Sequence, residues 1–125
     1  MTRTQSKVSE SLPLREPTFF ILLSLVAEDK HGYAILKDVA EISQGKVRLS
    51  TGTLYEALAR LLDQGFIERV FDDEEGVDES QKGQIHPGKP RKAYRLTKTG
   101  RRVLEAETTR MMSLAATAQR RLSEA

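Results

Sequence analysis

The feature that most constrains the fold is the stretch of residues 49–62, which has the pattern of one helix with two unlike faces. Apolar residues recur at intervals of three and four, as on a helix that packs against a core: Leu54, Leu58, Leu61 and Leu62. Its start is rich in hydroxyl groups, and Ser50 is the residue best placed to accept hydrogen bonds from the first turn. The other face has no bulky apolar side chain and carries Thr51, Thr53, Tyr55, Glu56 and Arg60.

This helix has the pattern of a recognition helix that enters the major groove of DNA. Threonine side chains can hydrogen-bond base edges or contact a thymine methyl group, and Tyr55 or Arg60 can bond a phosphate or a base. Many ordinary surface helices share the pattern, so the interpretation depends on the elements that surround it.

Length and composition indicate one soluble domain of 125 residues with a modest core. The absence of cysteine excludes disulfides and thiolate metal sites. The apolar run at residues 19–27 is too short to span a bilayer, and residues 1–16 lack the apolar centre of an export signal. We therefore expect a cytoplasmic protein that does not bind membranes.

The charge distribution favours a partner made of phosphates. The net charge is +2, but residues 72–79 contain six acidic residues and no basic one, so the rest of the chain carries +8. A basic body with one acidic loop suits binding to nucleic acid. A solvated surface loop is the simpler interpretation of the acidic window itself.

Two helices are expected before residues 49–62. Residues 19–27 are apolar on nearly all sides, which suits a buried helix after Pro17, although composition alone also allows a buried strand. Residues 28–32 form a polar turn, and an amphipathic helix then follows from Tyr33 to the Gly45 region. His31 is interpreted as a turn or capping residue, because one other histidine is too few for a metal site.

Two strands joined by a long loop are expected next. Residues 66–71 alternate partly, residues 92–96 are their partner, and residues 72–91 connect them. Three helices followed by such a hairpin indicate a mainly α (α+β) fold, namely a winged helix-turn-helix domain with a two-stranded β-wing. Three basic residues at the end of the wing can contact a phosphate backbone: Lys89, Arg91 and Lys92.

A last helix, capped by Thr97, carries a heptad pattern. The seam consists of Leu104, Thr108, Met111, Ala115, Ala118 and Leu122. Packing on a second copy is the simplest way to bury it, although the stripe could also fold back on the core. The expected organisation is a flexible N-terminal arm (1–16), a winged helix-turn-helix domain (17–96) and a C-terminal dimerisation helix (97–125).

Four separated motifs together resemble the PadR transcriptional regulators. They are His31-Gly32-Tyr33, the segment from Leu49 to Tyr55 with Leu58, Leu61 and Gly65, the wing segment Gly88-Lys89-Pro90-Arg91-Lys92, and Tyr94-Arg95-Leu96-Thr97 with Gly100. The resemblance covers about residues 18 to 104, and the single C-terminal helix is similar to the smaller subfamily, whose members dimerise through it.

The resemblance implies a dimeric repressor that binds an inverted-repeat DNA operator. Such regulators are commonly released by a small apolar or phenolic effector, but no effector-binding residues are assigned here. Carried over by position, the resemblance implies DNA contacts by Tyr33, Ser50, Thr51, Thr53 and Tyr55, with the three basic wing residues as further contacts.

The alternative function is that of a winged-helix module that binds a basic protein through residues 72–79. An enzyme is not expected, because the chain lacks cysteine, a phosphate-cradling glycine loop and a paired-carboxylate motif. No catalytic residue, cofactor or metal is predicted.

Overall fold

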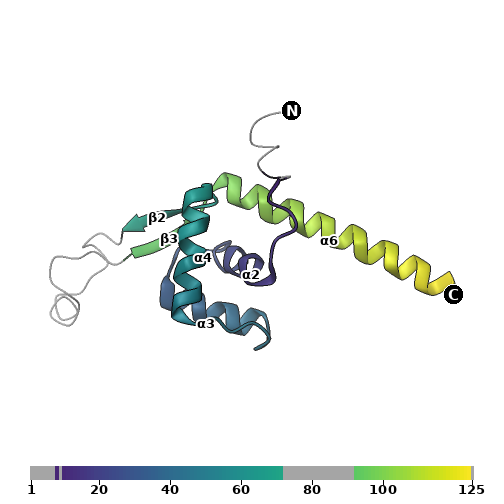
Figure 1. Cartoon of the computed structure of the whole chain (residues 1–125), viewed down its shortest axis with the longest axis horizontal. Coiled ribbons are helices and arrows are strands. Elements are labelled where there is room, and N and C mark those ends of the chain that lie inside the picture. Colours follow the sequence, from purple (N-terminus) through teal and green to yellow (C-terminus); the bar gives the residue numbers. More distant parts are fainter. Residues whose placement is uncertain (1–7, 9, 72–91, 125) are drawn as a thin grey trace.

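A group of short helices stands beside a small sheet, and one long helix extends away from both (Figure 1). The computed structural model describes residue 8 and residues 10–71 and 92–124. In chain order the elements are α2 (Glu16–Ser24), β1 (Lys30–His31), α3 (Gly32–Ile42), α4 (Thr51–Gln64), β2 (Ile67–Phe71), β3 (Lys92–Leu96) and α6 (Lys98–Glu124). Within these ranges, no helix is both long and apolar enough to cross a membrane.

The core is formed where α2, α3 and α4 meet the sheet and the start of α6. The apolar run after Pro17 is a helix, and its Ile21 and Leu22 are completely buried. Opposite them lie Ile35 and Val39 of α3 and the buried leucine stripe of α4, as the helical spacing predicted. Helix α2 ends at Ser24, before the apolar run does, and the Lys30 amino group donates a hydrogen bond of 2.7 Å to the Ser24 carbonyl.

The sheet has three strands rather than the two that the sequence suggested. Its order is β1-β3-β2 with antiparallel pairing, so the predicted hairpin of β2 and β3 is present. The additional strand lies in the segment that was expected to be a polar turn, where Lys30 pairs with Tyr94 and His31 with Ala93. A strand of two residues shows no alternation that could be recognised in the sequence.

Helix α6 begins against the turn between α4 and β2. The Thr97 hydroxyl accepts a hydrogen bond of 3.0 Å from the Gly100 N–H, which confirms the predicted cap, and donates one of 2.7 Å to the Gly65 carbonyl. A Cβ at Gly100 would collide with the backbone carbonyl of Phe66. Gly100 is therefore required for the close approach of α6 to this turn.

The segment that was expected to be a flexible arm, residues 1–16, includes three apolar residues that contact the body. Val8, Leu12 and Leu14 pack against the core. The Leu14 N–H also donates a hydrogen bond of 2.9 Å to the carboxylate of Glu107, a buried residue of α6. The sequence pattern missed this packing because these apolar residues follow no helical or strand period.

The predicted seam of α6 divides into two parts. Leu104 is 5% exposed and belongs to the core of the protomer, so its main role differs from the dimer contact that the heptad pattern predicted. Residues 111–124 are exposed along their whole length. That segment extends away from the body (Figure 1). At 1.5 Å per residue it is about 21 Å long.

Candidate nucleic-acid interface

The N-terminus of α4 is closed by a side-chain cap. Ser50 has extended backbone angles, and its hydroxyl accepts a hydrogen bond of 3.1 Å from the Thr53 N–H. The same hydroxyl donates to the Thr53 side-chain oxygen at 2.9 Å. This confirms Ser50 as the N-cap. Because its one proton is used within the chain, Thr53 keeps the hydroxyl proton that can be donated outward.

The first turn of α4 is open on its outer side. Thr51, Gly52 and Thr53 are all exposed, and a Cβ built at Gly52 would meet no atom within 4 Å. The opposite side of the helix is buried through Leu54, Ala57, Leu58 and Leu61. The helix is therefore held by its apolar face, while its hydroxyl-rich start is available to a partner.

Tyr55 connects α4 to the start of α3. Its hydroxyl lies so close to Gly32 that a side chain at that glycine would collide with it, yet 48% of Tyr55 remains exposed. Tyr33, the next residue of α3, is 76% exposed. The packing of Tyr55 over Gly32 thus explains the glycine that precedes Tyr33, and it places two partly exposed phenols at the meeting point of the two helices.

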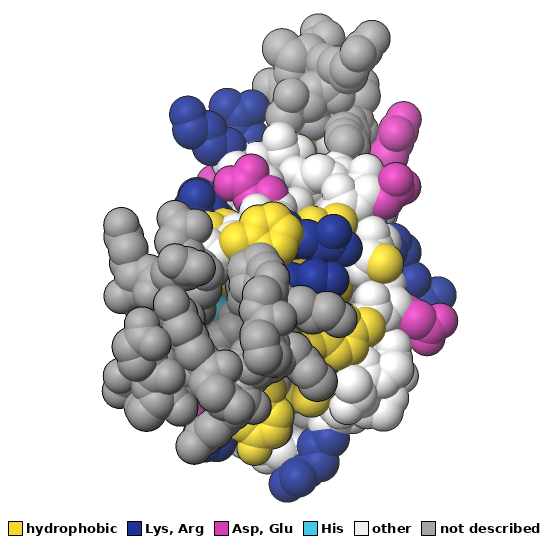
Figure 2. Space-filling view, turned by 90° about the vertical axis from the view of Figure 1, so that its left-hand side faces the viewer, with side chains coloured by type: hydrophobic (Ala, Val, Ile, Leu, Met, Phe, Trp, Pro, Cys, Tyr) yellow, Lys and Arg dark blue, Asp and Glu magenta, His cyan; other side chains and the backbone are white. Residues whose placement is uncertain are grey.

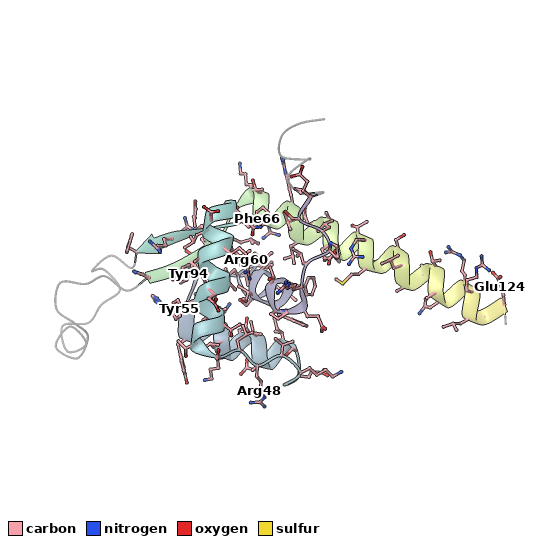
Figure 3. The ribbon with its side chains drawn as sticks, in the orientation of Figure 1. Arg48, Tyr55, Arg60, Phe66, Tyr94 and Glu124 are labelled. Atoms are coloured by element: carbon pink, nitrogen blue, oxygen red, sulfur yellow. The ribbon has the colours of Figure 1, made fainter. Side chains whose placement is uncertain are left out.

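A third tyrosine, Tyr94, lies in β3. Tyr94 is almost fully buried, and burial is the main cause that raises its pKa above the usual value, with the nearby Tyr55 adding to the rise. The Arg69 guanidinium on β2 opposes that rise and donates a hydrogen bond to the Tyr94 hydroxyl. Tyr94 is consequently a neutral phenol that links α4 to the hairpin; Figure 3 labels Tyr55 and Tyr94 on these two elements.

The predicted contact residues do not all share one surface. Arg60 is exposed on α4, but it follows Tyr55 by five residues, which turns it about 140° around the helix. Lys92 is exposed at the start of β3. Lys89, Arg91 and the acidic window 72–79 lie outside the described residues.

Arg69 was not among the residues selected from the sequence. The alternation of β2 does place it on the same strand face as Ile67, so the signal was present, but a lone arginine in a short strand has no distinctive pattern. His31 lies at the N-cap position of α3, and its Nδ1 is 2.8 Å from the Lys92 carbonyl oxygen. Across the parts of the chain that the structure describes, no group of acidic, histidine or cysteine side chains is suited to hold a metal ion.

Three helices whose last member presents its N-terminus, followed by an antiparallel hairpin, define a winged helix-turn-helix protein. Residues 21–106 match the model of the family described as "Transcriptional regulator PadR-like family". The chain belongs to this family, which is one of transcriptional regulators and not of enzymes. A comparison with curated protein sequences gave no match.

Solved structures of PadR family regulators have the same fold. One from Clostridium difficile R20291 is 26% identical, with a TM-score of 0.67, and the match covers 86% of this chain and 99% of that one. One from Eggerthella lenta DSM 2243 is 27% identical, with a TM-score of 0.60 and 94% coverage of both chains. Bacillus subtilis PadR, solved in complex with operator DNA, is 25% identical, with a TM-score of 0.56, over 74% of this chain and 47% of that one.

Proposed function

We propose that this protein is a sequence-specific DNA-binding regulator of transcription that inserts α4 into the major groove. The observation that carries the proposal is the division of α4 into a buried leucine face and a capped, exposed N-terminus with free space at Gly52. Reading base edges requires short polar groups near the end of a firmly held helix. The Bacillus subtilis relative, which was solved in complex with operator DNA, supports binding of DNA by this chain.

Specificity is assigned to a few side chains at that end of α4. Thr51 and the outward hydroxyl of Thr53 face away from the core, and Tyr55 and Tyr33 flank them. Ser50 acts mainly by fixing the first turn, since its hydroxyl is engaged with Thr53. Lys92, with Lys89 and Arg91, supplies positive charge for the phosphate backbone.

The active form is proposed to be a homodimer held together by the distal part of α6. Exposure of Met111, Met112, Leu114 and Leu122 on a helix that projects from the body supports this, because such residues leave water when two copies pair. Two copies present two α4 helices, which read half-sites about one helical turn apart in an inverted repeat. The protein would act in the cytoplasm. By occupying a promoter it would sterically block transcription.

We further propose that a small apolar effector releases the protein from DNA. Its effect would be recognised as a fall in DNA affinity without unfolding. Because an effector that binds equally well to free and DNA-bound protein shifts nothing, it must favour the free form.

The proposal is tested by recovering bound sequences from fragmented genomic DNA with the purified full-length protein. The expected result is enrichment of one inverted repeat, with half-sites about ten base pairs apart centre to centre. A variant with Thr51→Val and Thr53→Val serves as the matched control, since both side chains are exposed. Recovery of fragments without a shared sequence, or equal recovery by the variant, would refute sequence-specific reading by α4.

A further inference from the structure

The two faces of the hairpin differ in charge. Residues paired directly across antiparallel strands have their side chains on the same face. The register therefore places one set of side chains together, which we call the core-side face: Ile67, Arg69, Phe71, Lys92, Tyr94 and Leu96. The set on the other side, which we call the outer face, is Glu68, Val70, Ala93 and Arg95.

On the outer face, the positive charge of Arg95 is neutralised by acidic side chains. The Arg95 guanidinium donates hydrogen bonds of 3.2 Å and 2.9 Å to the two carboxylate oxygens of Asp29, and it lies 3.8 Å from Glu68. One positive group is thus matched by two negative ones. A phosphate approaching this face would meet no net attraction.

The core-side face has the opposite character. Its inner part is covered by the helices, because Ile67 and Tyr94 are buried, whereas Arg69 and Lys92 are exposed farther out. None of the six residues of this face is acidic, and among the described residues no carboxylate forms an ion pair with Arg69. Figure 2, which looks onto this end of the molecule, shows Lys and Arg side chains beside hydrophobic ones.

The Arg69 side chain is also held in place by Tyr94, its neighbour on β3. Its guanidinium hydrogen-bonds to the hydroxyl of Tyr94, and Tyr94 in turn lies close to Tyr55 of α4. The cation therefore lies on the first strand of the wing, on the strand face that also carries Tyr94 next to the helix that we propose enters the major groove. An arginine with one N–H fixed keeps further donors whose planar geometry suits a phosphate.

We propose that Arg69 binds a phosphate of the DNA backbone that runs between α4 and the wing, and so fixes how deeply α4 sits. This inference rests on the proposed function. A sugar–phosphate backbone separates the groove read by a recognition helix from the groove next to it, so an ordered cation at that place contacts phosphate and not a base. Arg69 then contributes to affinity for all sequences, while α4 supplies the discrimination.

The test compares Arg69→Gln with Arg95→Gln in full-length protein, because each removes one charge from the same hairpin. Binding to the recovered operator and to a scrambled duplex is measured over a series of salt concentrations. For Arg69→Gln we expect weaker binding to both duplexes and a slope of log affinity against log salt that is shallower by about 0.9 per phosphate lost, so about 2 for two subunits. Arg95→Gln should keep the wild-type slope.

A second measurement locates the phosphate. Neutral methylphosphonates are placed at single positions of the operator, and one position per half-site should weaken wild-type binding without weakening Arg69→Gln further. Because loss of the Asp29 pair could destabilise Arg95→Gln, Arg121→Gln on the exposed end of α6 is a second control for charge. Thermal unfolding of Arg69→Gln should match that of the wild type.

The outcomes separate the two claims. An unchanged salt slope for Arg69→Gln, or loss of the same methylphosphonate effects in both arginine variants, overturns the role of Arg69 even if the operator is bound specifically. Equal binding of the wild type to operator and scrambled duplex defeats the proposed function, and the slope measured on the scrambled duplex still decides whether Arg69 contacts phosphate.

Discussion

At the scale of single residues, three glycines separate what the fold needs from what a partner needs. Gly32 and Gly100 are each overlaid by another part of the chain, the Tyr55 ring in one case and the Phe66 carbonyl in the other. Gly52 has open space around it. Nothing within the described residues requires a glycine there. Under the proposed function, its lack of a side chain leaves room for DNA to approach the start of α4.

Gly52→Ala should therefore leave the fold intact and weaken DNA binding. Alanine is favoured over glycine in a helix by up to about 1 kcal/mol, so the free energy of unfolding should stay equal or rise. The added methyl group should reduce operator affinity by roughly 1–3 kcal/mol, the size of one good base contact. Urea unfolding and fluorescence anisotropy measure the two quantities.

Gly100→Ala is the matched control, and it should lower the stability of the fold more than it weakens DNA binding. Crowding against the Phe66 backbone should lower the free energy of unfolding by roughly 1–3 kcal/mol. If Gly52→Ala destabilises the fold as much as Gly100→Ala does, or binds the operator like the wild type, the reading of Gly52 as a place of close approach is wrong.

Tyr55→Phe isolates the phenolic hydroxyl from the packing of the ring. The ring over Gly32 is retained, so stability should change little, whereas specific binding should weaken by roughly 1–3 kcal/mol through the lost hydrogen bond to DNA. Anisotropy titrations on operator and scrambled duplex give the comparison. Identical operator affinity for the variant and the wild type would remove the Tyr55 hydroxyl from the contacts.

At the scale of elements, the sequence patterns that succeeded were those with a period or a chemical cap. The leucine spacing of α4, the Ser50 and Thr97 caps and the alternation of β2 with β3 all appear in the structure as predicted. Strand β1 was missed because two residues carry no period. The positions of α4 and its cap could thus be derived, but the support of Tyr55 by Gly32 and of Arg69 by Tyr94 could not, since both are contacts between distant segments.

The packing of the N-terminal segment was missed for a related reason. Glu107 resembles any charged residue of an exposed helix, yet its side chain is buried and accepts a hydrogen bond from the Leu14 N–H. The Arg110 guanidinium is the main cause that lowers its pKa, with the Leu14 N–H assisting against the opposing effect of burial. The segment is held on α6 by this carboxylate, which only the folded chain brings next to Leu14.

Glu107→Gln should therefore destabilise the protein and change how its stability depends on pH. Hydrogen bonds to a charged group are worth about 1.5–3 kcal/mol, which is the expected loss in unfolding free energy at neutral pH. Since the folded-state pKa lies below the ordinary 4.5, the wild-type advantage is complete above that value and disappears as the pH falls through the lowered pKa. Urea unfolding at pH 7 and across pH 5 to 3 would contradict this if the difference between variant and wild type did not shrink with acid.

At the scale of the whole molecule, α6 has two different roles along its length. Val103, Leu104 and Glu107 are buried and attach its first half to the domain, whereas residues 111–124 are exposed. The heptad pattern does not distinguish these two parts, because residue spacing alone cannot show that Leu104 packs into the core of the protomer. A dimer of such chains would hold its two α4 helices at a separation set by the first half of α6, which attaches to the domain.

Ala115→Glu should abolish dimerisation without unfolding the protomer, since this seam residue is exposed in the single chain and a buried unpaired carboxylate would oppose pairing. Ala116→Glu, one residue away and off the seam, is the matched control and should remain dimeric. Sedimentation velocity gives the oligomeric state. A monomeric wild type, or equal behaviour of the two variants, would refute the predicted seam.

Leu104→Ala belongs to the other half of α6 and should act on folding. Truncating this buried leucine should lower the free energy of unfolding by about 2–5 kcal/mol. Urea unfolding of the monomeric Ala115→Glu protein, with and without Leu104→Ala, measures that loss free of dimerisation. A loss below about 1 kcal/mol would mean that Leu104 contributes little to the protomer core.

The most direct test of DNA reading by α4 is a titration of the wild-type protein at two salt concentrations. It compares the DNA upstream of the protein's own gene with a scrambled duplex of equal length. We expect tight binding to the upstream DNA only, two subunits per site, and affinity that falls steeply as salt increases, because phosphate contacts provide most of the affinity. Weak and equal binding to both duplexes would contradict the account and direct attention to a protein partner.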